Sequence, residues 1–362
     1  MIYLSPPNVG KKELSEISHV IDSGWVSSVG SAIDEFEDLL ADYYGDRSVL
    51  ALNSGTSALH LALILSGVEE GDHVLVSSFT FAACANVILY ERAVPIFIDS
   101  EEYTWNLDPE VLEDYLKNAK RLPKALIVTH LFGTPAEIEK VCRIAKKYCV
   151  RVIEDAAEAL GAKVRDRQVG GFGDFGVLSF NGNKIITTSA GGALVCSEKD
   201  KEQGRYLASQ ANSGNHGYDH KVKGFNYRMS NVLAGIGLGQ LNKLSFFIKK
   251  KRVIYDRYKE ELSGFIEFGP ESDDYSNRWL TTGLVKRVEV KGLIEALYEQ
   301  DIESREVWKP LHLHEAYNAF KFYGTGKCEQ IFQKGICLPS GTGLTESEQA
   351  YVIEKVREYC NQ

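Results

Sequence analysis

The stretch Val49–Ser57, which reads VLALNSGTS, decides the fold because it joins a short apolar run to the start of a helical pattern. Val49–Leu52 predicts a buried strand, and the apolar spacing over Ser57–Ser66 predicts a helix. Gly55 in the connecting turn allows close backbone approach, and the first turn of a helix offers free N–H groups at its positive end. The stretch therefore predicts a phosphate site, with an ordinary helix N-cap as the alternative interpretation.

The same alternation of apolar runs and helical patterns continues along the chain. We expect strands at His73–Ser78, Pro95–Asp99, Ala125–His130 and Val150–Glu154. We expect helices at Glu35–Tyr44, Phe81–Glu91, Pro109–Ala119 and Ala136–Cys149. Strands that are continuously apolar and alternate with helices predict an α/β fold, with a mostly parallel sheet covered by helices on both faces.

The second half of the chain has a different pattern. Phe175–Phe180 and Gly192–Cys196 read as neighbouring strands, and a long helical stretch runs from Asn231 to Leu262. After about residue 265 the chain reads as a smaller α+β unit, whereas residues 1–30 read as short segments with Pro and Gly. We therefore expect a large domain at residues 1–245 and a small C-terminal domain at residues 246–362.

Composition argues against several classes of partner. The chain of 362 residues has 41 Lys and Arg against 50 Asp and Glu, a formal net charge of −9, which disfavours nucleic acids and anionic membranes. We find no run of about 18 apolar residues and no basic N-terminal region followed by an apolar run, so we expect neither a membrane span nor a signal peptide. Seven cysteines without a CxxC pair predict reduced thiols in the cytoplasm and no metal site.

A second motif places a carboxylate near the predicted phosphate turn. Asp155 ends the apolar run Val152–Glu154, and ligands of open α/β sheets bind outside the carboxyl ends of the strands. The small residues Ala156 and Ala157 leave room for a flat group. Asp155 is therefore a candidate for holding the protonated ring nitrogen of pyridoxal phosphate (PLP), with a helix cap as the alternative role.

The third motif supplies a lysine. Lys184 lies in the polar, Gly-containing turn between the two later strands, and by itself a lysine is most often a solvated surface residue. A phosphate turn, a carboxylate and a later lysine are together what PLP needs, because the lysine forms a Schiff base and then carries the proton. Phe81 is a candidate for stacking on the pyridine ring, with a place in a helix core as its alternative.

These residues together resemble the DegT family of PLP-dependent sugar aminotransferases, which have the aspartate aminotransferase fold, fold type I. The resemblance runs from Gly24–Ser27 to Cys337–Thr342. Within the family the likeness is strongest to the transaminases of the bacillosamine pathway, which make UDP-4-amino-4,6-dideoxy-N-acetylglucosamine. The stretches that carry this likeness are Leu4–Pro7, Ser77–Phe81, Glu154–Gly161, Asn181–Ser189 and Phe332–Cys337.

The resemblance implies a role for each matching residue. Lys184 is the Schiff-base lysine and the catalytic acid–base, and Asp155 pairs with the ring nitrogen. Phe81 and Ala157 cover the two faces of the ring. The expected phosphate ligands are Gly55, Thr56, Ser57 and Ser179. Glu158 stands near the PLP hydroxyl, where many family members have Gln, and would have to be protonated or turned away there.

The resemblance also implies a shared active site in a homodimer. The segment Gly224–Ser230 looks like the family loop that reaches the phosphate of the neighbouring subunit. We favour Asn226 for that contact and keep Arg228 as the other candidate. The expected sugar-nucleotide residues are Trp25, Val26, His130, Arg305, Trp308, Lys309 and His312. Packing of a turn is the alternative for Trp308, and a role away from the sugar is the alternative for His130.

The activity that follows is amino-group transfer. Sugar dehydratases of the same fold replace the catalytic lysine by His, and this chain keeps Lys184. We expect L-glutamate as the donor and the C4 keto group of a UDP-linked 2-acetamido-2,6-dideoxy-4-keto-hexose as the acceptor. A GDP-linked 4-keto sugar or a 3-keto sugar is the alternative acceptor, and a PLP-binding regulator without turnover is the alternative class.

Overall fold

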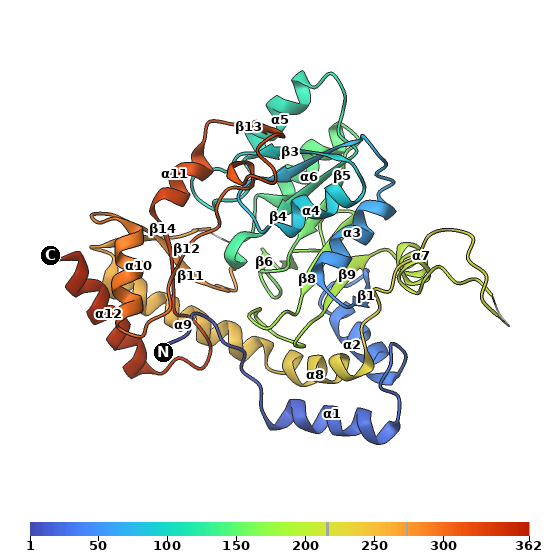
Figure 1. Cartoon of the computed structure of the whole chain (residues 1–362), viewed down its shortest axis with the longest axis horizontal. Helices are drawn as coiled ribbons and strands as arrows, with labels where there is room; N and C mark the ends of the chain where they lie inside the picture. The colour runs from blue at the N-terminus through green and yellow to red at the C-terminus, as the bar shows by residue number, and fades with distance from the viewer. Residues whose placement is uncertain (215–216, 273, 362) are drawn as a thin grey trace.

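Two β-sheets organise the computed structural model, which describes residues 1–214, 217–272 and 274–361 (Figure 1). The large sheet has the strand order β1-β9-β8-β5-β4-β2-β3-β13. Its strands are β1 (Ser48–Leu52), β2 (His73–Ser77), β3 (Val94–Ile98), β4 (Ala125–Thr129), β5 (Arg151–Asp155), β8 (Phe175–Ser179), β9 (Gly192–Cys196) and β13 (Lys321–Tyr323). Only β9 runs antiparallel to its neighbours β1 and β8 among these strands, so the prediction of a mostly parallel α/β sheet is confirmed.

Helices cover both faces of the large sheet, and its strands are therefore buried on both sides. The first face packs against α2 (Ser31–Ala41), α5 (Pro109–Asn118), α6 (Ile138–Lys147) and α8 (Asn231–Leu241) in one hydrophobic cluster. The opposite face packs against α3 (Gly55–Leu65), α4 (Ala83–Tyr90) and α7 (Glu198–Ala208) in a second cluster. A short hairpin of β6 (Lys163–Val164) and β7 (Arg167–Gln168) follows β5.

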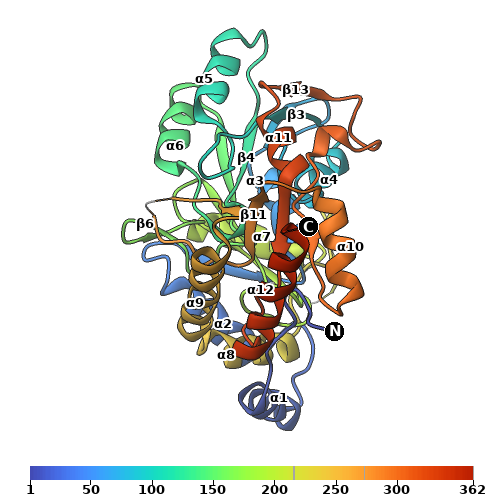
Figure 2. The same ribbon diagram turned by 90° about the vertical axis from the view of Figure 1, so that its left-hand side faces the viewer.

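The smaller sheet is antiparallel and has the order β10-β11-β14-β12. Its strands are β10 (Ile266–Phe268), β11 (Thr281–Val285), β12 (Arg305–Glu306) and β14 (Gly335–Leu338). Its core is shared with α9 (Leu244–Leu262), α10 (Val290–Glu299) and α12 (Glu346–Cys360), which Figure 2 shows grouped beside it. The chain between β12 and β14 leaves this sheet, adds β13 to the edge of the large sheet beside β3, and returns through α11 (Lys327–Lys334).

The predicted helix over Asn231–Leu262 is wrong in one respect, because the structure divides it into α8 and α9. The Asn242 side chain donates to the Leu238 carbonyl at 3.0 Å, which offers the backbone an alternative to the helical ladder. Gln240 and Lys243, on either side of the break, both donate to the Glu13 carboxylate. Contacts with another segment therefore fix the break.

The expectation of only short segments in residues 1–30 is also wrong, because they contain α1 (Lys11–Ser23). This helix lies alongside α8 at one end of the molecule (Figures 1 and 2). It buries Val20 and the ion-paired Glu13, whereas Leu14 and Ile21 are exposed, so its apolar spacing gives a weak signal. A Cβ on Gly239 of α8 would come within 3.0 Å of the Glu13 backbone, so a glycine is needed for this close approach. None of the helices in the described ranges combines the length and apolar character that a membrane crossing requires.

Candidate active site

The predicted cofactor residues meet at the carboxyl edge of the large sheet. Asp155 ends β5 and Ser179 ends β8, two parallel neighbours, and β1 leads into the turn before α3 at the same edge. A Cβ added to Gly55 would lie 3.0 Å from the Ser179 Cβ and 3.4 Å from its hydroxyl oxygen. The start of α3 and the end of β8 are therefore in contact, and the absence of a side chain at Gly55 keeps space between them.

The turn before α3 is held by its own hydroxyl groups. Ser54 is the N-cap and accepts the Ser57 N–H at 3.0 Å, and the Ser57 hydroxyl donates to Asn53 at 2.6 Å. The Ser57 N–H is thus engaged within the turn, which competes with its expected role as a phosphate ligand. Gly55 and Thr56 lie in the first turn, where helix geometry leaves N–H groups without intrahelical acceptors.

The Asp155 carboxylate is buried and fixed on both oxygens. One oxygen accepts the Ala157 N–H at 3.1 Å, and the other accepts the Cys84 thiol at 3.0 Å. Burial and the nearby Asp155 charge raise the pKa of Cys84, so the thiol stays protonated and donates. Asp155 therefore accepts hydrogen bonds on both oxygens in a position shielded from solvent.

Lys184 projects into the same region. Its side chain is 13% exposed, its Nζ lies 3.8 Å from Glu158 Oε1, and the Trp279 ring centroid is 4.0 Å from Nζ. The indole N–H of Trp279 donates to the carbonyl of Asn183 at 2.7 Å, which fixes the residue before the lysine. Lys184 and Glu158, predicted separately, are therefore neighbours.

Glu158 is buried and accepts two hydrogen bonds. The Phe132 N–H donates to it at 2.7 Å and the Trp308 indole at 3.2 Å. Burial raises the pKa of Glu158 to about 7, although Lys184 and these donors act in the opposite direction. This carboxyl group is therefore a mixture of neutral and charged forms at neutral pH.

Aromatic rings extend the site away from the sheet. The Trp308 ring is stacked on Phe132, with centroids 6.3 Å apart, and is 5.4 Å from the Phe81 ring. Phe81 is 53% exposed, so its ring is accessible rather than part of a helix core. Phe81, Trp308 and Glu158 thus belong to one group of side chains around Lys184.

Arg305 lines a small cavity of about 160 Å³ next to the lysine turn. The cavity is also lined by Asn183 and by the N-terminal segment Tyr3–Pro6. The Arg305 guanidinium is exposed and paired with Glu303 at 2.6 Å, so a ligand anion would have to compete with that carboxylate. Lys309 is exposed and lies one residue after Trp308.

His130 and His312 hold the framework rather than face this group. His130 is fully buried, where it pairs with Glu154 at 3.0 Å and accepts the Ala136 N–H at 3.1 Å. The His312 ring is stacked on Phe322 at 3.9 Å, with its nitrogens bonded to Ser78 and Glu329. In this conformation both rings have protein partners at both nitrogens.

Trp25 and Val26 lie outside the group within one chain. Both are exposed in the connection between α1 and α2, and the Trp25 carbonyl accepts the Asn231 side chain at the start of α8. Asn226 is exposed beside the turn before α3, since its carbonyl accepts the Asn53 amide at 3.0 Å. Arg228 is half-buried, and burial together with Arg205 lowers its pKa.

Three contributors were missed by the sequence interpretation: Cys84, Asn277 and Trp279. Asn277 donates to the carbonyls of Glu158 and Leu160, 3.0 Å away in each case. These contacts join residues about a hundred positions apart, so motif spacing gives no signal for them. No motif in the sequence marks Trp279, which lies two residues before β11.

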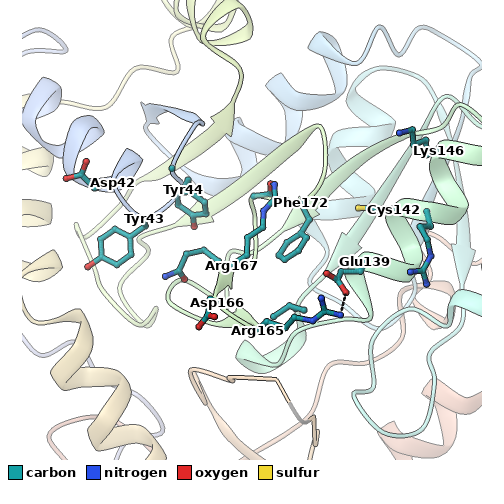
Figure 3. Close-up of a pocket in the computed structure, with 15 residues that line it drawn as sticks. Asp42, Tyr43, Tyr44, Glu139, Cys142, Lys146, Arg165, Asp166, Arg167 and Phe172 are labelled. Carbon is teal, nitrogen blue, oxygen red and sulfur yellow. Dashed lines mark hydrogen bonds and ion pairs between the residues drawn. The ribbon is translucent and has the colours of Figure 1, made fainter.

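A larger cavity of about 820 Å³ lies away from these residues (Figure 3). It lies between α6, the turn after α2 and the β6–β7 hairpin. Two of its cations have partners, since Arg165 pairs with Glu139 at 3.2 Å and Arg167 lies over the Phe172 ring at 4.5 Å. None of the predicted site residues lines it.

The converging residues fit PLP by their chemistry. A buried carboxylate suits a protonated ring nitrogen, a helix start suits a phosphate, and a shielded lysine amine suits an aldehyde carbon. Asp155, Gly55 and Lys184 provide these groups at one sheet edge.

Comparisons with known proteins agree with this reading. Residues 7–357 match the model of the DegT/DnrJ/EryC1/StrS aminotransferase family. The chain is 47% identical to EpsN of Bacillus subtilis (strain 168), named as a pyridoxal phosphate-dependent aminotransferase, over 98% of this chain and 94% of that protein. It is 36% identical to GDP-perosamine synthase of Escherichia coli O157:H7, over 98% and 97% of the two chains.

A solved structure extends the agreement to the fold. The PLP form of Spr1654 from Streptococcus pneumoniae, named as a sugar aminotransferase, superposes with a TM-score of 0.92 at 26% identity, covering 99% of this chain and 98% of that one. The family match spans nearly the whole chain, and the residues expected to bind the cofactor meet at one sheet edge. The chain therefore belongs to the DegT/DnrJ/EryC1/StrS aminotransferase family and is a PLP-dependent sugar aminotransferase.

Proposed function

We propose that the chain transfers the amino group of L-glutamate to the C4 keto group of a UDP-linked 2-acetamido-2,6-dideoxy-4-keto-hexose. The product would be UDP-4-amino-4,6-dideoxy-N-acetylglucosamine. The observation that carries the proposal is the group formed by Lys184, Glu158 and Trp308, in which Glu158 replaces the Gln of many family members. A buried carboxyl group beside the catalytic lysine supports the bacillosamine-type subgroup that the motifs resemble.

The proposed roles follow from the contacts. PLP supplies the electron sink that makes the transferred proton acidic. Lys184 holds the cofactor between turnovers and, once released, moves the proton to the substrate carbon, which its shielded position favours. Asp155 keeps the ring nitrogen protonated, and its bonds from Cys84 and Ala157 orient it. The N–H groups of Gly55 and Thr56 bind the phosphate, with Ser179 beside them.

Substrate recognition is assigned to the aromatic and cationic residues around the lysine. The exposed Phe81 and the partly buried Trp308 border the space in front of Lys184. The exposed charges of Arg305 and Lys309 suit a diphosphate, because guanidinium and ammonium groups form strong hydrogen bonds to phosphate oxygens. We propose that these residues receive the nucleotide part of the substrate.

We also propose a homodimer in which each site is completed by the second copy. Asn226 is exposed at the phosphate turn, whereas Arg228 is half-buried near charged groups of its own chain, first among them Arg205, which favours Asn226 for the contact across the interface. Trp25 and Val26 are 61% and 47% exposed, an apolar surface that a second copy would cover.

A GDP-linked 4-keto sugar is the second candidate substrate, and the 36% identity to GDP-perosamine synthase favours it over a 3-keto sugar. The deciding experiment offers the purified chain L-glutamate with UDP-, GDP- and dTDP-linked keto sugars and identifies the amino sugar by NMR. We expect turnover with the UDP-linked 4-keto sugar at least tenfold above the others. Faster turnover of a GDP-linked sugar contradicts the proposed substrate.

The catalytic role of Lys184 is tested separately. We expect Lys184→Ala to lose turnover by at least a thousandfold, because both cofactor attachment and proton transfer depend on its amine. Lys199→Ala, an exposed lysine on α7, is the matched control and should keep the wild-type rate. Wild-type turnover by Lys184→Ala contradicts the mechanism, and absence of any glutamate half-reaction in the wild-type chain favours a regulator without turnover.

A further inference from the structure

We propose that Trp279 is the positioning residue for Lys184. It holds the turn that carries the lysine and keeps the amine directed at Glu158. The proposal rests on the role proposed above for Lys184, and it concerns a residue outside the phosphate turn, the ring-nitrogen carboxylate and the substrate segment.

One indole makes two contacts with the lysine turn. Its N–H donates to the Asn183 carbonyl at 2.7 Å, and its ring centroid lies 4.0 Å from Lys184 Nζ. The first contact fixes the backbone directly before the lysine. The second attracts the amine in its charged form to the ring face, because the π system has a negative face. Together they determine both ends of the Lys184 side chain.

Trp279 is itself rigidly held, as a positioning residue must be. Trp279 is 1% exposed. Its backbone N–H donates to the Asn277 side-chain oxygen at 2.8 Å, and its backbone carbonyl accepts a hydrogen bond from Lys251 Nζ at 2.7 Å. The indole is nearly parallel to the Phe132 ring, with an interplanar angle of 17° and centroids 6.5 Å apart. A side chain restrained on its backbone and on its ring transmits position rather than adapting to its neighbour.

The same segment also fixes the other side of the lysine. Asn277 donates to the Glu158 carbonyl, and the Phe132 N–H donates to the Glu158 carboxylate. Asn277 and Trp279, which lie just before β11 of the small sheet, therefore contact both members of the pair that lies 3.8 Å apart, Glu158 and Lys184. The orientation of Lys184, in the connection between β8 and β9, therefore depends on the segment that leads into the small sheet.

The test compares Trp279→Leu, Trp279→Phe and the control Trp105→Leu. Trp105 is 3% exposed and belongs to the same hydrophobic cluster as Trp279, so its replacement removes an equally buried indole. The first readout is the rate at which added PLP forms the C=N bond with Lys184, with release of water, in the cofactor-free chain. It is followed by visible absorbance and confirmed by borohydride reduction and peptide mass.

We expect attachment in Trp279→Leu to slow by about 10- to 100-fold, the effect of moving a reacting group by about 1 Å. The value of kcat should fall by a similar factor while KM for the keto sugar stays within about twofold, since Trp279 acts on the lysine. Trp279→Phe keeps the ring face but loses the N–H and should recover at least half of the lost rate on a logarithmic scale. Trp105→Leu should stay within about twofold of wild type.

Wild-type attachment in Trp279→Leu overturns the proposal, as does an equal loss in Trp105→Leu. Should Trp279→Leu not fold, Trp279→Phe decides, with a slowing of about threefold or more expected and an unchanged rate contradicting the proposal. The attachment assay contains no sugar, so an error in the proposed substrate leaves it unaffected. Lys184→Ala is its reference: a reducible PLP bond in that variant refutes the role of Lys184 itself.

Discussion

At the scale of single residues, Glu158 is the side chain whose state depends most on its surroundings. Its carboxyl group is buried between the Phe132 N–H, the Trp308 indole and the Lys184 amine. Burial raises its pKa to about 7, from an ordinary value of 4.5. Since the folded chain holds this proton more tightly than the unfolded chain does, Glu158 makes the fold less stable as pH rises from about 4.5 to 7.

The Glu158→Gln variant tests this dependence. At pH 4 the variant and the wild type should differ little, because the Glu158 carboxyl group is then mostly neutral in both the folded and the unfolded chain. At pH 8 the variant should be more stable by up to about 3 kcal/mol, the free energy equivalent to the shift. Urea unfolding of the cofactor-free chains at the two pH values measures this difference. A difference that is the same at both pH values contradicts the raised pKa.

Sequence reasoning finds a residue when the chemistry is local and misses it when the contact is distant. Gly55, Asp155 and Lys184 each end or follow a recognisable strand, so a parallel sheet brings them to one edge. Trp279 and Asn277 act on residues 96 and 119 positions away, and no spacing rule links such pairs.

At the scale of elements, Asp99 fastens α11 to the large sheet. It follows β3, and its carboxylate accepts backbone N–H groups from four consecutive residues, 325–328, at the start of α11. Burial by itself would raise the pKa of Asp99, but the hydrogen bonds from Cys328, Lys327 and Ser100 outweigh it and lower the pKa below 3.8. Asp99 therefore stabilises the fold above pH 3.8, and this contribution is lost as pH falls through the lower folded value.

We expect Asp99→Asn to reduce the free energy of unfolding by about 2 kcal/mol at pH 7, because charge-assisted hydrogen bonds are replaced by weaker neutral ones. The loss should diminish below about pH 3.8, where the Asp99 carboxylate of the unfolded wild-type chain takes up a proton and the folded one still resists it. Urea unfolding at pH 7 and pH 3 gives both values. Asp256→Asn, exposed on α9, is the control and should change stability by less than about 0.5 kcal/mol. A loss that is unchanged at the lower pH contradicts this account of Asp99.

The elements themselves show where local pattern is sufficient. Most strands and helices of the large sheet follow from apolar runs and helical spacing, because burial on both faces leaves a strong pattern, whereas β13 and α7 were not predicted. The sequence does not predict α1, because the buried side of this helix includes the charged Glu13. It does not predict the break between α8 and α9 either, because the break depends on contacts with Glu13 of α1. Both errors come from an ion pair between distant segments.

At the scale of the whole molecule, the proposed dimer makes each active site a joint product of two chains. Lys184 would come from one copy and Asn226 from the other. Mixing two inactive or impaired variants can therefore rebuild an intact site. Such recovery of activity requires that each site takes residues from both chains, and two separate sites in one dimer would not give it.

Co-expression of Lys184→Ala and Asn226→Ala chains with different tags tests the sharing. The purified mixed dimer should contain one site with both native residues and should recover about half of wild-type turnover. The matched control pairs the double variant Lys184→Ala/Asn226→Ala with a wild-type chain, which leaves no site with both residues. Equal activity of the two mixed dimers contradicts a shared site.

The pairing of residues 321–323 with the large sheet has a consequence for folding during synthesis. Strand β3 is complete once residue 98 has been made, but its outer neighbour β13 begins only at residue 321. Until then β3 is an open edge with unpaired backbone groups, which is the kind of surface that invites pairing with another chain. The large sheet therefore cannot be completed during synthesis until residue 323 has been made, and β3 keeps its open edge until then.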